Sequence, residues 1–171
     1  MSKNLVLIGF MGVGKGTVAR ALSKRNGMFT LDSDDLIVSM ENRKIKTIFE
    51  KEGEDYFRAV ERKTAKWLSQ NVTNSIISTG GGFFKVDKLN DIGKIIYLKS
   101  SFEGIIERLK AQPNAAQKFA KRPLFKDIDK AEALFNERAI QYEKKADIVI
   151  SVEKQDIDKI IDNILEEIKN D

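Results

Sequence analysis

Residues 9–17, which read Gly-Phe-Met-Gly-Val-Gly-Lys-Gly-Thr, constrain the fold of this chain more than any other segment. An unbroken apolar run at residues 5–8 precedes them, and such a run suits a parallel strand that is covered on both faces. A helical pattern follows at residues 18–25. This order, with the spacing G-x-x-x-x-G-K, is typical of a loop whose backbone N–H groups wrap a phosphate. The alternative is a glycine-rich turn that binds nothing.

The rest of the chain alternates between short apolar runs and helical patterns. Further strands are predicted at residues 29–31, 76–79, 95–98 and 148–150, and further helices at 36–41, 47–52, 55–69, 102–109, 131–142 and 157–168. This alternation predicts an α/β protein of three layers, α/β/α, with a five-stranded parallel sheet and the P-loop NTPase fold. We expect a single kinase-type domain over residues 1–171. Within it, we expect an acceptor-binding helical region at about residues 33–62 and a mobile lid at about residues 111–127.

Composition limits the chemistry that this chain can perform. Its 171 residues include no cysteine and no histidine. A general base must therefore be a carboxylate, or the reaction must proceed without a base poised near neutral pH. The formal net charge is +4, with charges of both signs interspersed, which fits many anionic partners.

The location and assembly of the protein follow from its apolar segments. No apolar stretch is long enough for a transmembrane helix. A signal peptide formed by Lys3 and residues 5–13 is an alternative, but Lys15 and Arg20 interrupt the regions that such a peptide needs. We therefore expect a cytoplasmic protein without a membrane partner. We also expect a monomer, because no large exposed apolar stripe is evident.

Lys15 is the residue of the glycine loop that is expected to reach the β- and γ-phosphates of a nucleotide. The positive end of the following helix also favours an anion there. The pattern usually has serine or threonine directly after the lysine, whereas this chain has Gly16 followed by Thr17. This variant resembles that of adenylate kinases, and it leaves open whether Thr17 or a water molecule binds Mg²⁺.

Asp32 and Asp34 follow the predicted second strand. If this segment is extended, the two side chains point in different directions and serve different purposes. One would hold Mg²⁺ through water, and the other would meet the hydroxyl group that accepts the phosphate. Simple capping of the next helix is the alternative.

Arg58, Glu61 and Arg62 share one face of a predicted helix. Spacing alone favours a solvated face of ion pairs. The sharper hypothesis is that Arg58 clamps a substrate carboxylate through two hydrogen bonds while Glu61 fixes its orientation.

Three consecutive glycines, Gly80-Gly81-Gly82, follow the predicted third strand. They indicate either backbone N–H groups that approach a ligand closely or a floppy loop.

Arg122 lies in the predicted lid, among the basic residues Lys118, Lys121 and Lys126. A closing arginine would stabilise a transferring phosphate and exclude water. The alternatives are a solvated basic loop or a nucleic-acid patch. Phe119 is the single aromatic residue before the Pro123-Leu124-Phe125 end of this segment, so base stacking is poorly supported and no nucleic-acid partner is expected.

Taken together, these segments resemble the shikimate kinase family along nearly the whole chain. The matching elements are the loop at residues 9–17, Leu31-Asp32-Ser33-Asp34, Ile48-Phe49, Phe57-Arg58-x-x-Glu61, Ser78-Thr79-Gly80-Gly81-Gly82, Arg122-Pro123-Leu124, and Arg138-x-x-x-Tyr142 followed by Ala146-Asp147. Two departures stand out, namely Gly16 and a stretch from Arg108 to Arg122 that is longer than is common in the family.

The resemblance implies that ATP phosphorylates shikimate at its 3-hydroxyl, giving shikimate 3-phosphate and ADP on the route to chorismate and the aromatic amino acids. It implies Mg²⁺ as a cofactor. The catalytic residues would be Asp34, Lys15 and Arg122. The ATP-binding residues would be Gly12, Val13, Gly14, Lys15, Gly16, Thr17, Arg108 and Arg122. The shikimate-binding residues would be Asp34, Phe49, Phe57, Arg58, Gly80, Gly81, Gly82 and Arg138, and the metal-binding residues would be Thr17 and Asp32.

Within these sets, the resemblance implies individual roles. Asp34 would be the base at the attacking hydroxyl, and a carboxylate of ordinary pKa would suffice. Arg58 and Arg138 would hold the shikimate carboxylate, with Phe49 and Phe57 as a wall. Asp32 would organise Mg²⁺ through water. Adenine would lie between residues 151–154 and the lid base, where Arg108 and Lys110 are both possible contacts.

Two other classes of function remain open from the residues. One is another small-molecule kinase, such as a gluconate or nucleoside-monophosphate kinase, and the Gly-Lys-Gly-Thr variant slightly favours the latter. The other is a nucleotide-dependent switch that binds a partner protein and transfers nothing.

Overall fold

A parallel sheet of five strands organises the computed structural model, which describes residues 4–120 and 122–170. Its strands are β1 (Asn4–Ile8), β2 (Phe29–Asp32), β3 (Ser75–Ser78), β4 (Gly93–Lys99) and β5 (Ile148–Ser151). Their order in the sheet is β2-β3-β1-β4-β5, and each neighbouring pair is parallel. The predicted sheet is therefore confirmed. Because β1 lies next to β3, the loops that follow these two strands meet at the same edge of the sheet.

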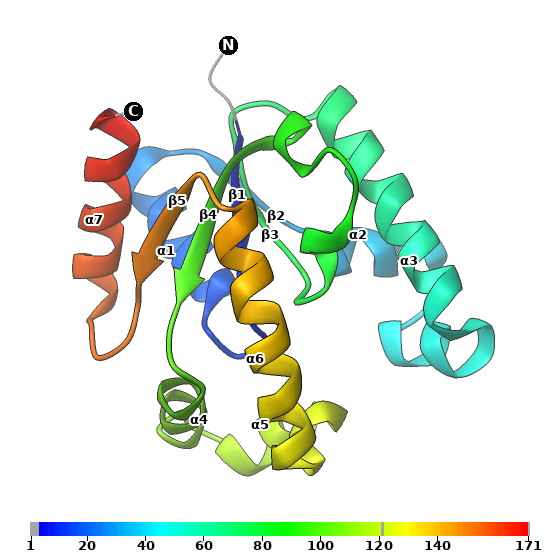
Figure 1. The fold of residues 1–171 in the computed structure, drawn as a ribbon. Coiled ribbons are helices and arrows are strands. Elements are labelled where there is room, and N and C mark those ends of the chain that lie inside the picture. The colour runs from blue at the N-terminus through cyan, green and yellow to red at the C-terminus, as the bar shows by residue number, and fades with distance from the viewer. Residues whose placement is uncertain (1–3, 121, 171) are drawn as a thin grey trace.

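Helices cover both faces of the sheet, as predicted. They are α1 (Lys15–Asn26), α2 (Ser33–Glu41), α3 (Ile45–Asn71), α4 (Phe102–Lys110), α5 (Ala115–Ala120), α6 (Ile128–Lys145) and α7 (Ile157–Asn170). Helices α1 and α7 pack together on one face, and α6 lies across the other face beside β4 (Figure 1). Helices α4 and α5 gather beyond the carboxyl ends of β4 and β5 (Figure 1).

Among the described residues, the apolar side chains form two hydrophobic clusters. The larger one surrounds the sheet, and every residue of β1 is buried in the way expected of a central parallel strand. The smaller one joins α2 to both parts of α3 through Ile37, Ile48, Phe57 and Val60. Full burial of each such side chain stabilises the fold by about 1.5–3 kcal/mol. The smaller cluster lies within residues 33–62, the region expected to bind the acceptor.

Helix α3 breaks where the sequence indicates a stop. Gly53 has φ 82° and ψ 177°, a backbone conformation in the region that favours glycine. The helix resumes at once, so α3 consists of two helical parts joined at Gly53, close to the two predicted helices.

Three predicted helix starts are wrong by three residues. One is that of α6, which begins at Ile128 rather than at residue 131 because the Asp127 side chain caps it. Gly14 adopts φ 107°, which ends the loop and lets α1 begin at Lys15 rather than at residue 18. The Asp32 side chain caps α2, which therefore begins at Ser33 rather than at residue 36.

Several short elements were not predicted. Two 3-10 helices, η1 (Phe83–Lys85) and η2 (Leu89–Asp91), lie between the triple glycine and β4. The segment expected to form a mobile lid contains α5 and the 3-10 helix η3 (Pro123–Lys126). The rings of Phe119 and Phe125 join these two elements, with centroids 5.8 Å apart.

Across residues 4–120 and 122–170, none of the helices combines the length and the apolar character that a bilayer crossing requires.

Candidate active site

A cleft of about 400 Å³ opens at the carboxyl ends of β2 and β3, beside the glycine loop. Most residues predicted for the site line it: Gly12, Gly14, Lys15, Gly16, Thr17, Asp32, Asp34, Gly80, Gly81, Arg108 and Arg122. They come from five separate segments of the chain. The structure therefore brings residues predicted to bind phosphate into one cleft with three residues predicted to bind the acceptor, namely Asp34, Gly80 and Gly81.

Lys15 lies buried at the base of this cleft. Its Nζ donates hydrogen bonds to the carbonyl oxygens of Gly9 at 2.6 Å and of Phe10 at 3.1 Å. Burial lowers the pKa of Lys15 to about 8, although the carboxylates of Asp34 and Asp32 act in the opposite direction. The glycine loop thus holds a desolvated ammonium group where a phosphate would be bound.

Gly12 and Gly14 of this loop have backbone conformations that residues with a side chain rarely adopt. Gly12 has φ 86° and Gly14 has φ 107°. A Cβ on Gly14 would lie 2.5 Å from Nη2 of Arg108, so the guanidinium group lies directly against the loop. Gly16 differs, because its φ is not in the left-handed region and a Cβ there would lie 3.3 Å from Nη1 of Arg20.

Asp32 and Asp34 do not share an extended segment, so that expectation is wrong. Oδ1 of Asp32 accepts hydrogen bonds from the backbone N–H groups of Asp34 at 2.9 Å and Asp35 at 3.3 Å. Asp32 therefore caps α2, the alternative considered from the sequence, and Asp34 lies in the first helical turn. Both side chains nevertheless line the cleft.

Asp34 lies among several charged side chains. Burial raises the pKa of Asp34 to about 6, and the nearby carboxylates of Asp32 and Glu61 add to this shift while Lys15 opposes it. Its Oδ1 is buried and has no hydrogen-bond partner among the described residues. Asp34 is therefore a stronger base than the ordinary carboxylate that the sequence led us to expect.

The triple glycine is a seam where three predicted acceptor residues meet. A Cβ on Gly80 would lie 2.7 Å from Oδ1 of Asp34, and one on Gly82 would collide with the guanidinium group of Arg58. A Cβ on Gly81 would lie 3.5 Å from Nη1 of Arg138. A Cβ on Gly80 or Gly82 would thus require the end of a side chain to move, whereas one on Gly81 would make ordinary van der Waals contacts. The N–H group of Gly80 donates to Oγ of Ser33 at 3.0 Å. It is therefore already bonded within the protein, whereas one of the two sequence interpretations had it approaching a ligand.

Arg58 forms a partly buried network rather than a solvated ion pair. Its Nη1 donates to Oε2 of Glu61 at 2.6 Å, and Glu61 is only 1% exposed. Its Nε and Nη2 both donate to Oε1 of Glu54, at 3.3 Å and 3.1 Å. The solvated face that spacing alone favoured is therefore wrong for Arg58 and Glu61, whereas Arg62 is exposed.

Phe49 and Phe57 lie beside this network. The centroids of their rings are 4.6 Å apart, and the Arg58 guanidinium carbon lies 5.5 Å from the Phe57 centroid. Phe57 is buried, while Phe49 is 37% exposed. The structure thus gives Arg58 an aromatic neighbour.

Arg108 and Arg122 reach the cleft from the lid side. Arg108 Nε and Arg122 Nη1 are buried donors without a partner among the described residues. Burial lowers the pKa of both side chains, and the charge of Arg108 adds to the shift of Arg122. Two unsatisfied cations that converge on one cleft suit an anionic ligand. Lys121, of the same basic set, lies outside the described residues, as does the side chain of Lys118.

A second cavity of about 280 Å³ adjoins the glycine loop at Val13 and Arg108. Its far side is formed by residues 152–155, which include most of the loop predicted to face adenine. Glu153 ties this loop to α4, because its carboxylate accepts from the N–H of Ser101 at 3.0 Å and from its Oγ at 2.9 Å. Of the two possible lid-base contacts, Arg108 lines this cavity, whereas Lys110 is exposed.

Comparisons with known proteins agree with this geometry. The sequence profile described as "Shikimate kinase" matches residues 11–169. A shikimate kinase from Helicobacter hepaticus is 42% identical over 149 residues, which cover 87% of this chain and 86% of the relative. One from Sulfurihydrogenibium sp. is 37% identical and covers 98% of both chains.

The chain belongs to the shikimate kinase family. A solved structure of shikimate kinase from Acinetobacter baumannii in complex with shikimate superposes with a TM-score of 0.85. The two chains are 29% identical, and the match covers 99% of this chain and 94% of the other. The five-stranded parallel sheet and the P-loop kinase fold of the family are thus confirmed for this member.

One residue of this shikimate kinase family site was given no role from the sequence. Tyr142 is buried and donates from its hydroxyl to the carbonyl oxygen of Gly81 at 2.5 Å. It lies one helical turn after Arg138, which is also buried and whose Nε lacks a partner among the described residues. The i, i+4 spacing of these residues on α6 was the available signal.

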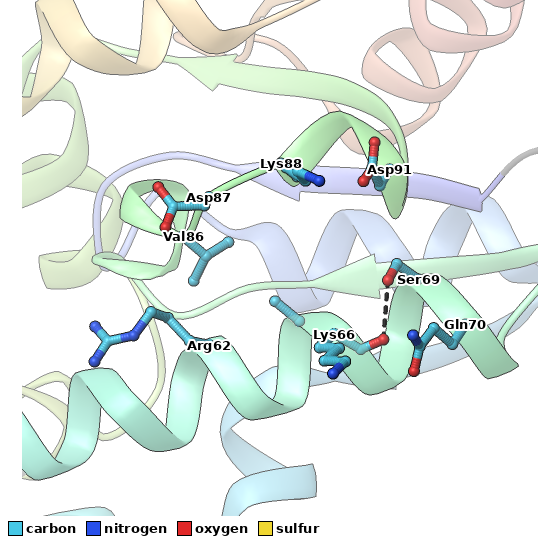
Figure 2. Close-up of a pocket in the computed structure, with 9 residues that line it drawn as sticks. Arg62, Lys66, Ser69, Gln70, Val86, Asp87, Lys88 and Asp91 are labelled. Carbon is cyan, nitrogen blue, oxygen red and sulfur yellow. Dashed lines mark hydrogen bonds between the residues drawn. The ribbon is translucent and has the colours of Figure 1, made fainter.

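A separate groove of about 330 Å³ contains none of the site residues predicted from the shikimate kinase resemblance. It runs between the second part of α3 and the segment that contains η2, and Figure 2 shows Arg62, Lys66 and Asp87 along it. Arg62 thus lies at this groove, and it also lines a smaller cavity with Arg58 and Glu61.

Proposed function

We propose that this protein transfers the γ-phosphoryl group of ATP to the 3-hydroxyl of shikimate, forming shikimate 3-phosphate and ADP for aromatic amino-acid biosynthesis. The observation that carries the proposal is the meeting of two half-sites at the triple glycine. Lys15, Arg108 and Arg122 form a cationic cleft on one side. On the other side, the side chains of Asp34, Arg58 and Arg138 lie close to the space that a Cβ would occupy on Gly80, Gly82 and Gly81.

On the donor side, the phosphates of ATP lie in the cleft over the glycine loop. Nζ of Lys15 gives up its hydrogen bond to the carbonyl oxygen of Gly9 and donates to a phosphate oxygen instead. Nη1 of Arg122, which has no partner among the described residues, donates to the γ-phosphate. Gly12–Thr17 supply backbone N–H groups and the amino end of α1. Adenine occupies the adjoining cavity between Arg108 and residues 152–155.

On the acceptor side, Arg58 and Arg138 bind the carboxylate of shikimate. The Nε/Nη2 edge of Arg58 already holds one carboxylate oxygen, that of Glu54, whose side chain is 63% exposed. Because exposed ion pairs contribute little free energy, the substrate carboxylate replaces Glu54 at that edge. Glu61 remains on Nη1 and keeps the guanidinium group in place. Phe49 and Phe57 wall this side, and Gly80–Gly82 border it.

Asp34 accepts the proton of the attacking hydroxyl. With a pKa of about 6 it is ionised at neutral pH, and its buried Oδ1 is available to a hydroxyl donor. The remaining catalysis is positioning and neutralisation of charge, because the phosphoryl transition state is loose and needs little covalent assistance.

Mg²⁺ is the proposed cofactor, and Thr17 and Asp32 are the residues that would hold it. Both line the cleft beside Lys15, and oxygen donors are the ligands that Mg²⁺ prefers. Within the part of the chain that the structure describes, no group of three acidic side chains could hold the ion alone. Water and ATP phosphates would therefore complete the coordination of Mg²⁺ beside Thr17 and Asp32, and the bound ion would supply positive charge against those phosphates.

The test is ADP formation by the purified protein with MgATP and one acceptor at a time. We expect ADP release that depends on shikimate, with gluconate and nucleoside monophosphates inactive. ADP release with one of those acceptors instead would assign another small-molecule kinase. Slow turnover stimulated only by a protein would assign a nucleotide-dependent switch.

The same preparation, examined by size-exclusion chromatography with light scattering, is expected to be monomeric.

A further inference from the structure

We infer that the hydroxyl group of Tyr142 is a positioning group for the shikimate carboxylate, and that it acts through Gly81 and Arg138. This inference rests on the proposed function. Tyr142 itself lies behind the site, with 1% of its surface exposed, so it works through its neighbours.

The first observation is the hydrogen bond between α6 and the glycine seam. The hydroxyl of Tyr142 donates to Gly81 O at 2.5 Å, across 61 residues of sequence. The carbonyl groups of Gly80 and Gly82 instead accept from backbone N–H groups of η1, at 3.1 Å and 3.2 Å. The bond from Tyr142 therefore fixes the middle of the seam to a different element, α6.

The second observation is that Gly81 is where three parts of the site meet. A Cβ built there would lie 3.5 Å from Nη1 of Arg138, 3.6 Å from the backbone nitrogen of Met11 and 3.9 Å from the hydroxyl of Tyr142. Arg138 belongs to the acceptor side, and Met11 belongs to the glycine loop. A shift of Gly81 would therefore change its spacing from Arg138 on one side and from the glycine loop on the other.

The third observation is that the ring of Tyr142 is held rigidly. It packs edge-on against Phe84 of η1, with centroids 4.6 Å apart, and against Tyr97 of β4 at 5.3 Å. A hydroxyl on a ring held from two sides has one position, so its bond sets the position of Gly81. Arg138, one turn earlier on the same helix, is thereby placed relative to the seam that also contacts Asp34 and Arg58.

The experiment compares Tyr142→Phe with Tyr97→Phe in the full-length protein. Both variants keep the aromatic stack and remove one hydroxyl from it, but only the first removes the bond to Gly81. For Tyr142→Phe we expect the shikimate Kd and KM to rise severalfold, with about tenfold as the upper limit set by the free energy of the one hydrogen bond that orders Gly81 before shikimate binds. The affinity for an ATP analogue and the kcat at saturating shikimate should change less than about twofold. Tyr97→Phe should leave all four values near those of the wild type.

A shikimate Kd that is unchanged in Tyr142→Phe would overturn the inference, as would equal weakening by Tyr97→Phe or a parallel loss of ATP affinity. Loss of cooperative unfolding in Tyr142→Phe would also contradict it, because the hydroxyl would then be a requirement of the fold. If the wild type itself fails to phosphorylate shikimate, the proposed function fails instead.

A double-mutant cycle with Arg138→Lys tests the route of the effect. If Tyr142 acts through Arg138, the losses in shikimate affinity of the two single variants will not add in the double variant. Additive losses would contradict action through Arg138.

Discussion

Asp34 and Lys15 lie in one cleft, and burial moves the pKa values of both toward neutrality. The pKa of Asp34 rises to about 6, and that of Lys15 falls to about 8. Between these values the carboxylate is ionised and the ammonium is protonated, which is the combination that proton removal and phosphate binding require. In the proposed mechanism, a chain without histidine thus obtains a base near neutral pH by burying an aspartate.

This arrangement predicts a bell-shaped pH dependence of kcat/KM in the free enzyme. The rate constant should rise through about pH 6 as Asp34 loses its proton and fall above about pH 8 as Lys15 loses its own. The measurement is kcat/KM for each substrate between about pH 5 and pH 9.5 at constant ionic strength. A flat profile below pH 7 would show that Asp34 is not the base.

Asp34→Asn should lower turnover by about two orders of magnitude or more while ATP binding stays nearly intact. It should also stabilise the fold at neutral pH. The folded-state pKa is above the ordinary 3.8, so the folded protein binds this proton more tightly than the unfolded chain. The ionised side chain therefore destabilises the fold above about pH 6, and this cost disappears below about pH 4.

Urea denaturation at two pH values measures that effect. At pH 7.5, Asp34→Asn should raise the free energy of unfolding by about 1–3 kcal/mol. Near pH 4, the same substitution should leave the free energy of unfolding unchanged. Asp35→Asn is the matched control, because Asp35 is the exposed neighbour on the same turn. Equal stabilisation by both variants would trace the gain to general charge reduction.

Arg58→Ala should weaken shikimate binding strongly and leave ATP affinity nearly unchanged. It should also lower the free energy of unfolding by about 2–4 kcal/mol, because Glu61 stays buried without its cation. Calorimetric titration with each substrate and urea denaturation measure the two effects. The control is Arg62→Ala, which truncates an exposed arginine one position beyond Glu61. It should change neither the shikimate affinity nor the free energy of unfolding. If Arg58→Ala loses ATP affinity instead, the division between donor and acceptor sites is wrong.

At the scale of elements, the glycines of the loop that leads into α1 differ in how well they tolerate a side chain. Gly14→Ala should abolish ATP binding, since it strains a backbone at φ 107° and drives a Cβ into Arg108. Gly16→Ser should fold normally, because only the flexible end of Arg20 must move. It should also tighten binding of MgATP relative to ATP in EDTA, because it restores the hydroxyl that other phosphate loops present. Equal loss of ATP affinity in both variants would contradict this distinction.

The elements that carry strong local signals could be predicted from the sequence. The run at residues 5–8, the stop at Gly53 and the apolar stripe of α7 each correspond to an observed strand, break or helix. The starts of α1 and α2 were missed because they depend on Gly14 and on the cap formed by Asp32. The 3-10 helices η1 and η2 were missed because such short turns carry no periodicity.

At the scale of the whole molecule, the order of the sheet assembles the site. Placing β1 next to β3 brings the glycine loop beside the triple glycine, although about 70 residues separate them in the chain. Helix α6 then adds Arg138 from the end of the chain that follows the lid. The family resemblance predicted which residues meet here. How they meet could not be predicted, because contacts such as that of Tyr142 with Gly81 depend on packing between distant segments.

The central claim is that the phosphate cleft and the carboxylate site formed by Arg58 and Arg138 face each other across Gly80–Gly82. The most direct test is the identity of the product formed from MgATP and shikimate, determined by proton–phosphorus correlation NMR. The account predicts one new phosphomonoester, coupled to the proton at C3 of shikimate and formed in equal amount to ADP. Phosphate coupled to another position, or ADP accompanied only by free inorganic phosphate, would contradict it.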